Sequence, residues 1–589
     1  MRTYLIALAI VCMATGCKSL QTTPSFDELT TEYFNDYLEL NPLSATSNGI
    51  PGYNDKLVLE MTQEYRTKKH AFYNKYQQML LTVPFNSLTD EQKISYKIIE
   101  WETEIGKKML QTDLHLLPVD HFNSLHLRMA MLASGTNVQP FRTVKDYNDF
   151  STRMELYSVW LDSARVAMKA GISKNIVLPR TLIMKMIPQF ESMINDTPEK
   201  HIFYAAINQM PAHFQEKERN QIASKYATII REKLNPKLSE MLHFLKTEYV
   251  AAGRTTDGIG ALPNGQAAYR AMVQWHTSTD MTPEQIHELG LREVARLQSE
   301  MELVKKQVGF DGTIREFFEH VRTKRELMPF TSPEQVIANF NAIHERIRPN
   351  VDKLFSLQPK MQFEVRRTEA FREETAAAQY VAGNLDGSRP GIFYVPIPDV
   401  TSYNTYGDED LFLHEAIPGH HFQIALQIEN EVLPEFRKYG WFGAYGEGWA
   451  LYTESLGKEL GLYTDPYQYF GMLGGEMHRA IRLVVDTGIH SKGWTREQAI
   501  QYSTDNEAES EASIISEIER YMAMPGQALS YKIGQITILD LRKKAEEQLG
   551  NKFDIRKFHE QLLESGGMPL ELLKSKITAW IDRQSDISR

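Results

Sequence analysis

The stretch Leu411–Gln423 reads L-F-L-H-E-A-I-P-G-H-H-F-Q and holds three histidines and one glutamate within eight residues. Metal-binding helices often carry His-Glu-x-x-His, a spacing that puts two imidazoles on one helix face beside a glutamate that can accept a proton. Here Pro418 stands where the second histidine of that pattern would be. On an ideal helix His414 and His420 would point about 120° apart. The two imidazoles can therefore bind one metal ion only if the helix is broken between them.

The sequence itself provides such a break. Pro418 lacks an N–H and disfavours helix at the residue before it, and Gly419 follows directly. His421 is nearer to His414 in azimuth, but two helical turns would separate them by about 10 Å. We therefore predict His414 and His420 as ligands and His421 as a neighbour of the ligand shell. The alternative, a regular helix with surface histidines, leaves the Pro-Gly break unexplained.

The third ligand is expected on the stretch Trp441–Leu456, which reads W-F-G-A-Y-G-E-G-W-A-L-Y-T-E-S-L. Glu447 lies there among apolar and small residues, where a carboxylate is rarely buried unless it is paired or bound to a cation. Glu454 follows seven residues later on the same helix face. We predict Glu447 as the ligand and Glu454 as the group that orients a histidine, although the two roles could be exchanged. Two imidazoles and a carboxylate favour one Zn²⁺ ion.

Helix signals dominate the rest of the chain, so we predict a mainly α fold. Capping-box patterns, in which a hydroxyl residue is followed three positions later by Glu or Gln, recur along the sequence. They start at Ser25, Thr89, Thr282, Ser332 and Thr495. The best strand candidate is Gly391–Val395, between two prolines.

Length, charge and glycine content bound the organisation. The chain has 589 residues and a formal net charge of −11, which argues against nucleic acid as a partner. The segment 251–265 contains four glycines and is our candidate boundary between an N-terminal helical half, 25–255, and a C-terminal catalytic half, 256–589. The alternative is a long loop within one continuous domain.

The N-terminus has the features of an export signal. Met1-Arg2 precedes an apolar run, Leu5–Met13, and small residues then precede Cys17. We predict a lipoprotein signal peptide over 1–16 and a lipidated tether over 17–24, although Ala14 stands where a leucine is usual. An ordinary signal peptide with an incidental cysteine is the alternative. The lipid on Cys17 would then be the membrane contact of an exported protein, anchored in the outer membrane and facing the periplasm or the cell surface.

Four stretches together resemble a known family. They are H-E-A-I-P-G-H-H from His414, Y-G-E-G-W-A-L-Y-T-E from Tyr445, V-D-T-G-I-H-S-K-G-W-T from Val485, and R-Y-M-A-M-P-G-Q-A-L-S-Y-K-I-G from Arg520. They resemble a bacterial family catalogued as the domain of unknown function number eight-eight-five. That family is similar to helical Glu-zincin peptidases such as angiotensin-converting enzyme and thimet oligopeptidase, which carry H-E-x-G-H and a downstream glutamate. Gly419-His420 would match their Gly-His, with two residues inserted.

The resemblance implies a large helical zinc-peptidase-like fold that encloses a cleft, with a small edge β-sheet near the metal. Gly391–Val395, which contains Tyr394, would be the edge strand that pairs with the substrate backbone. Arg520-Tyr521 resembles the Arg-Tyr pair that those peptidases place over the metal, where the phenol stabilises the oxyanion. Tyr531 is the alternative phenol, and a plain core role remains open for each tyrosine.

A third group of residues has helical spacing. Arg482, Asp486 and His490 fall on one helix face, at i, i+4 and i+8. We expect this face to contact the substrate or, through His490, the oxyanion. The alternative is a ladder of surface salt bridges.

These observations predict a zinc-dependent hydrolase of short peptides in which Glu415 is the general base. One alternative is a metal-dependent amidase that acts on non-peptide amides. Another is a non-catalytic surface lipoprotein that binds a partner. The sequence leaves the oligomeric state open.

Overall fold

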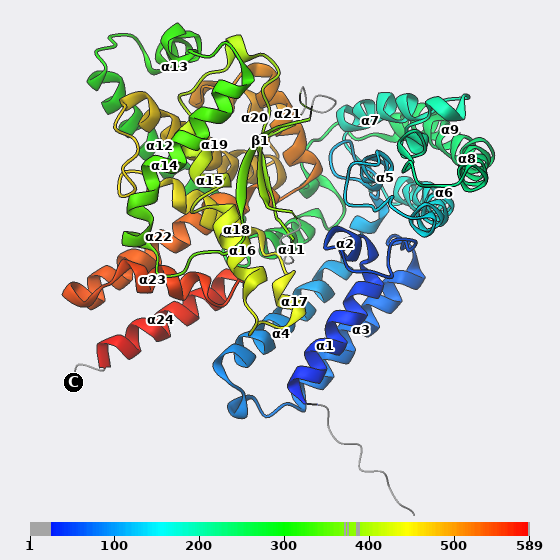
Figure 1. Ribbon diagram of the computed structural model, residues 1–589, viewed down its shortest axis with the longest axis horizontal. Coiled ribbons are helices and arrows are strands. Elements are labelled where there is room, and N and C mark those ends of the chain that lie inside the picture. The colour runs from blue at the N-terminus through cyan, green and yellow to red at the C-terminus, as the bar shows by residue number, and fades with distance from the viewer. Residues whose placement is uncertain (1–24, 370–372, 374–375, 385–388, 587–589) are drawn as a thin grey trace, which may run out of the picture.

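The computed structural model describes residues 25–369, 373, 376–384 and 389–586, and it is mainly α-helical (Figure 1). The predicted signal peptide, tether and Cys17 lie outside the described residues. The N-terminal helices form two groups, and the second group is the lobe on the right of Figure 1. The first group is α1 (Phe26–Leu40), α2 (Pro42–Ser47), α3 (Gln63–Leu81) and α4 (Asp90–Leu110). The lobe contains α5 (Leu125–Ala133), α6 (Val144–Ser173), α7 (Arg180–Met193), α8 (Glu216–Ile229), α9 (Asn235–Phe244) and α10 (Val250–Ala252).

The C-terminal half is also built from helices. These are α11 (Gly265–Thr277), α12 (Pro283–Gln307), α13 (Ile314–Thr323), α14 (Pro333–Leu354), α15 (Asp408–Glu415), α16 (His420–Glu429), α17 (Glu435–Lys438), α18 (Gly443–Glu454), α19 (Pro466–His490), α20 (Arg496–Asn506), α21 (Glu511–Ala523), α22 (Ser530–Leu549), α23 (Ile555–Leu563) and α24 (Leu570–Asp586). The five predicted capping boxes all form at the starts of α1, α4, α12, α14 and α20. None of the described helices combines the length and apolar character that a membrane crossing requires.

The helical run from α8 to α10 contains two π-helical turns, Ile230–Leu234 and Leu245–Tyr249. Pro236 lies two residues after the end of the first of them, in the first turn of α9. Because proline has no N–H and its ring collides with the carbonyl four residues earlier, the helix widens there instead of ending.

A three-stranded sheet lies beside α15 and α16, with the order β1-β3-β2. β1 (Phe363–Arg367) runs parallel to β3 (Gly391–Val395), and β2 (Gln379–Val381) runs antiparallel to it. The prediction that Gly391–Val395 is an edge strand is therefore wrong, because hydrogen-bonded neighbours occupy both of its sides. The edge nearest the site is β2. The sequence does not predict β2 because this strand is only three residues long and has no alternating apolar pattern.

The two predicted halves are in contact. The buried guanidinium of Arg437 on α17 binds Glu91 and Ser95 of α4 at 2.9 and 3.2 Å. The glycine-rich segment after α10 packs tightly on the end of α19, since a Cβ on Gly258 would lie 1.9 Å from the carbonyl oxygen of Ile489. Whether 255/256 separates two domains stays a prediction.

Two glycines allow α18 and α22 to cross with their backbones in contact. A Cβ on Gly448 would lie 2.4 Å from the Cα of Gly534, and a Cβ on Gly534 would lie 1.9 Å from the carbonyl oxygen of Ala444. Glu447 precedes the first glycine, and Tyr531 lies one helical turn before the second. The close crossing therefore brings a predicted ligand and a predicted catalytic phenol together.

Replacing Gly534 with alanine should destabilise the protein by about 1–3 kcal/mol, because the added methyl group must push two backbones apart. A thermal melt of the Gly534→Ala variant measures this as a lower Tm. Gly474→Ala is the matched control, since Gly474 also lies within a helix but has nothing within 4 Å of its Cβ position. Equal melting temperatures for the two variants would contradict the tight crossing.

Candidate metal centre

The helix that would have run through Leu411–Gln423 is interrupted. α15 ends at Glu415 and α16 begins at His420. Between them Ala416 leaves helical geometry at φ −107° and ψ −108°, and the Ile417–Pro418 peptide bond is cis. A Cβ on Gly419 would lie 1.9 Å from the carbonyl oxygen of His414, so only glycine fits this turn.

The break brings the two predicted histidine ligands together. The ring centroids of His414 and His420 lie 4.9 Å apart, with their planes at 89°. The indole N–H of Trp449, on α18, donates to the carbonyl oxygen of Pro418 at 2.8 Å. This bond attaches the turn to the helix that carries Glu447.

Glu447 lies where both imidazoles point. Its Oε2 atom is 3.8 Å from the Nε2 atom of His414 and 3.4 Å from the Nε2 atom of His420. Ligand atoms of all three residues lie within 4.8 Å of one another. Tetrahedral zinc with bonds of about 2.0–2.1 Å separates its ligand atoms by roughly 3.3–3.4 Å. The three side chains therefore fit a zinc ion, and Glu447 rather than Glu454 has the position of a ligand.

Glu454 lies beside His414, in the position predicted for the group that orients a histidine ligand. Its Oε1 atom lies 2.6 Å from Nδ1 of His414, so the carboxylate accepts the Nδ1–H bond and leaves Nε2 free to bind a metal. Burial raises the pKa of Glu454 to about 8, and burial also raises the pKa of Asp410, which hydrogen-bonds to it. A buried carboxylate pair of this kind costs free energy unless a positive charge lies nearby.

Glu415 is the last residue of α15 and lies beside the ligands. Its Oε2 atom accepts the backbone N–H of Tyr380, in β2, at 2.8 Å. Burial raises the pKa of Glu415 to about 7, although the charge of His420 opposes this. A carboxyl group with a pKa near neutrality can both take and return a proton at physiological pH.

The two candidate phenols have different surroundings. The hydroxyl of Tyr521 donates to Glu517 at 2.7 Å and accepts from Nε of Arg482 at 3.0 Å. Burial raises the pKa of Tyr531, and the charge of Glu447 raises it further while Arg482 opposes this. The guanidinium of Arg482 lies 4.5 Å from the Tyr531 ring. Of the two phenols, Tyr531 is therefore the one whose pKa is raised by the charge of the predicted ligand Glu447.

Arg482 and Arg520 both bind the carboxylate of Glu517, at 3.1 and 2.7 Å. Hydrogen bonds from His478 and Arg520 lower the pKa of Glu517 although burial opposes its charge. Burial opposes the charge of Glu447, but the hydrogen bond and charge of His420 lower its pKa, with smaller contributions from His414 and Arg482. The predicted Arg-Tyr pair is therefore one part of a buried network that borders the predicted metal ligands.

His490 and Asp486, also predicted to face the site, form hydrogen bonds to neighbouring segments of the chain instead. Nδ1 of His490 accepts the N–H of Ile259, and Nε2 meets the carbonyl of Tyr521, both at 3.0 Å. Asp486 accepts the Tyr269 hydroxyl at 2.6 Å and the Gly526 N–H at 3.1 Å. With both of its ring nitrogens engaged, His490 has no group left to contact an oxyanion. Asp486 and His490 do lie on one helix, α19, as their spacing predicts, but their side chains bind the segments around Ile259 and Gly526.

His421 and Tyr394 lie on the sheet side of the site. Nδ1 of His421 lies 3.0 Å from the Tyr380 hydroxyl, and its ring packs 4.9 Å from Phe363. Tyr394 is half-buried at the register position between Arg366 and Gln379. A contact between Tyr394 and substrate remains a prediction.

Sequence reasoning missed Asp410 and Tyr380. Asp410 precedes His414 by one helical turn, within a buried run of three acidic residues, Asp408–Asp410. Acidic residues are common at solvent-exposed helix starts, so the sequence does not indicate that this run is buried. The backbone N–H of Tyr380 could not be inferred, because any residue at that position of β2 would supply it.

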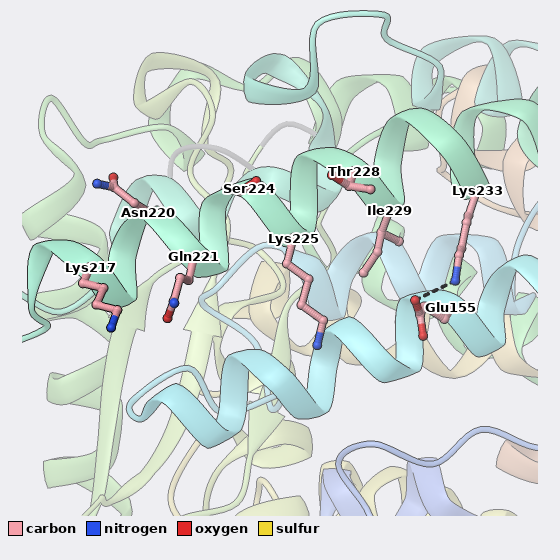
Figure 2. A pocket seen from close by; sticks show the side chains of 9 residues that line it. All are labelled: Glu155, Lys217, Asn220, Gln221, Ser224, Lys225, Thr228, Ile229 and Lys233. Carbon is pink, nitrogen blue, oxygen red and sulfur yellow. Dashed lines mark hydrogen bonds and ion pairs between the residues drawn. The ribbon is translucent and has the colours of Figure 1, made fainter.

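A hollow of about 720 Å³ lies elsewhere, between α6 and α8 in the N-terminal lobe (Figure 2). Lys233 and Glu155 form an ion pair within it at 2.7 Å. None of the predicted site residues lines this hollow, so it is separate from the candidate metal centre.

Comparison with known proteins agrees with the fold. The family described as bacterial protein of unknown function (DUF885) matches residues 42–577. The crystal structure of a "putative lipoprotein" from Colwellia psychrerythraea superposes with a TM-score of 0.86 at 26% identity, covering 95% of this chain and 99% of that one. A "putative lipoprotein of unknown function" from Shewanella oneidensis gives 0.75 at 21% identity, covering 94% and 100%. No curated protein matches the chain.

A carboxypeptidase from Pyrococcus furiosus also aligns, over 95% of this chain and 98% of that one. Its TM-score of 0.37 and its identity of 9% are too low to support an argument.

Replacing Glu454 with glutamine should weaken zinc binding about 10- to 100-fold, because His414 loses the carboxyl group that accepts its Nδ1–H and orients its ring. Competition with a chromophoric chelator measures the affinity. His421→Ala is the control and should bind zinc as the wild type does, since the His421 ring contacts Tyr380 and Phe363 instead. Equal losses in both variants would contradict the assigned ligand set.

Proposed function

The chain belongs to the DUF885 family, and we propose that it is a zinc-dependent peptidase. The observation that carries this proposal is the convergence of His414, His420 and Glu447, with the carboxyl group of Glu415 beside them. Preference for short peptides is part of the proposal and rests on the resemblance to helical Glu-zincins alone.

The metal site is buried but reachable. The side chains of His420 and Glu447 retain 11% and 16% exposure, whereas His414 retains 6% and Glu454 1%. Solvent and substrate would therefore approach from the side of His420 and Glu447. His414 and Glu454 form the closed back of the site.

Zinc bound there would polarise the scissile carbonyl and acidify a water molecule. Glu415 takes the proton of the attacking water and returns it to the leaving amine. The Tyr380 N–H holds the Glu415 carboxylate in place during both transfers. The Tyr531 hydroxyl donates a hydrogen bond to the oxyanion. The guanidinium of Arg482, which lies over the Tyr531 ring, stabilises the negative charge that develops on that oxygen.

The location proposed for the protein is the outer membrane, with a lipid on Cys17 as its anchor. Two structural relatives carry the description "putative lipoprotein", which supports an exported, lipid-anchored chain. The orientation toward the periplasm or the cell surface stays part of the proposal.

Replacing Glu415 with glutamine should leave zinc binding intact and lower kcat by about 10²–10⁴-fold, because the amide cannot accept the proton of water. Turnover of a peptide library by the zinc-loaded variant measures the loss, and metal analysis supplies the control. Wild-type turnover in Glu415→Gln would refute the assigned base. Cleavage of non-peptide amides but not of peptides by the wild type would favour the amidase instead, and failure of the wild type to bind zinc would favour the binding lipoprotein.

The two phenols can be separated by matched substitutions. Tyr531→Phe should lower kcat by about 10²-fold with little change in KM, because it removes one donor to the oxyanion. Tyr521→Phe removes a bond to Glu517 and should act mainly through a lower Tm. A larger loss of kcat in Tyr521→Phe than in Tyr531→Phe would reverse the assignment.

A further inference from the structure

Trp441 is an exposed aromatic residue beside a predicted metal ligand. The residue is 52% exposed, which is unusual for a tryptophan in a well-packed region. Its ring centroid lies 6.0 Å from that of His420, with the planes at 52°. No role in the mechanism above requires this side chain, so its exposed position calls for a separate explanation.

The indole is held against the first turns of α18. A Cβ on Gly446 would lie 2.3 Å from the Cη2 atom of Trp441, and a Cβ on Gly443 would lie 3.9 Å from its Nε1 atom. The benzo ring therefore covers the backbone at Gly446, the residue before the ligand Glu447. One face of the indole packs on the helix, and a large part of the side chain stays open to solvent.

The ring is also supported along the chain. Phe442, the next residue, is buried and packs 5.8 Å from Trp101 of α4. Trp441 thus extends from an anchored backbone and is pre-ordered before any ligand arrives. Ordering an aromatic ring in advance lowers the entropy lost when it binds a partner.

Resting on the proposed function, we propose that Trp441 forms the subsite for a large apolar or aromatic side chain of the substrate, next to the scissile bond. The open side of the site, at His420 and Glu447, is the side on which Trp441 lies. A flat, exposed indole stacks on aromatic rings and covers aliphatic side chains. The substrate class is therefore peptides with Phe, Tyr, Leu or Met at that position.

The indole could also attract a cationic side chain, since tryptophan faces bind Lys and Arg. The guanidinium of Arg482 lies 4.5 Å from the Tyr531 ring, so a positive group is already present near the proposed metal centre. A positive group already at the site disfavours a second one close to it. This charge favours the apolar occupant.

The test measures binding and turnover separately. Paired peptides that differ only in having Phe, Leu, Ser or Lys beside the scissile bond are titrated by calorimetry into zinc-loaded Glu415→Gln, and are cleaved by the zinc-loaded enzyme with Glu415 intact. We expect Phe and Leu peptides to be preferred over Ser by roughly three- to tenfold in Kd and kcat/KM. Trp441→Ala should bring the ratios of Kd and of kcat/KM between the Phe and Ser peptides close to one, whereas Trp441→Phe should retain most of the preference.

Trp275→Ala is the matched control. Trp275 is 40% exposed, but its ring packs against Trp101 rather than against a metal ligand. This variant should keep the wild-type preference. An unchanged preference in Trp441→Ala, an equal loss in Trp275→Ala, or a preference for Lys would overturn the subsite. Absence of cleavage together with a Trp441-dependent preference in binding would refute the peptidase and leave the subsite standing.

Discussion

The site depends on one interruption of the backbone. A regular helix through residues 414–420 would direct the two imidazoles to different sides, whereas the turn at Ala416–Gly419 brings their rings to 4.9 Å. The turn cannot accept a side chain at Gly419 and is attached to α18 through Trp449. The same turn ends α15 at Glu415, so the predicted ligands His414 and His420 and the proposed general base owe their relative positions to a single feature.

The second constraint is electrostatic. Glu447, Glu454, Asp410 and Glu415 bring four carboxyl groups into one largely buried region, with two histidines and the guanidinium of Arg482 as neighbours. Burial raises the pKa of Glu415, Glu454 and Asp410, which shows how costly their charges are in this environment. A divalent cation between His414, His420 and Glu447 would offset that cost. The close crossing of α18 and α22 at Gly448 and Gly534 then places Tyr531, rather than Tyr521 of α21, on the helix that packs against Glu447.

The sequence revealed the features that depend on local chemistry. Capping boxes predicted the helix starts because their hydrogen bonds join residues three positions apart, and Pro418-Gly419 predicted the break because proline lacks an N–H. Features set by tertiary packing escaped prediction. The central place of β3 depends on β2, a three-residue strand, and the loop contacts of His490 depend on where Ile259 and Tyr521 fold. Helical spacing alone could not distinguish a face that binds substrate from one that binds loops.

We infer that two imidazoles six positions apart, those of His414 and His420, bind the same ion as Glu447. X-ray absorption at the zinc edge of the metal-loaded protein tests it most directly. We expect two imidazole nitrogens at about 2.0–2.1 Å and carboxylate oxygen at about 2.0–2.2 Å. A spectrum with one imidazole or none, or with a shell of six oxygens, would contradict it.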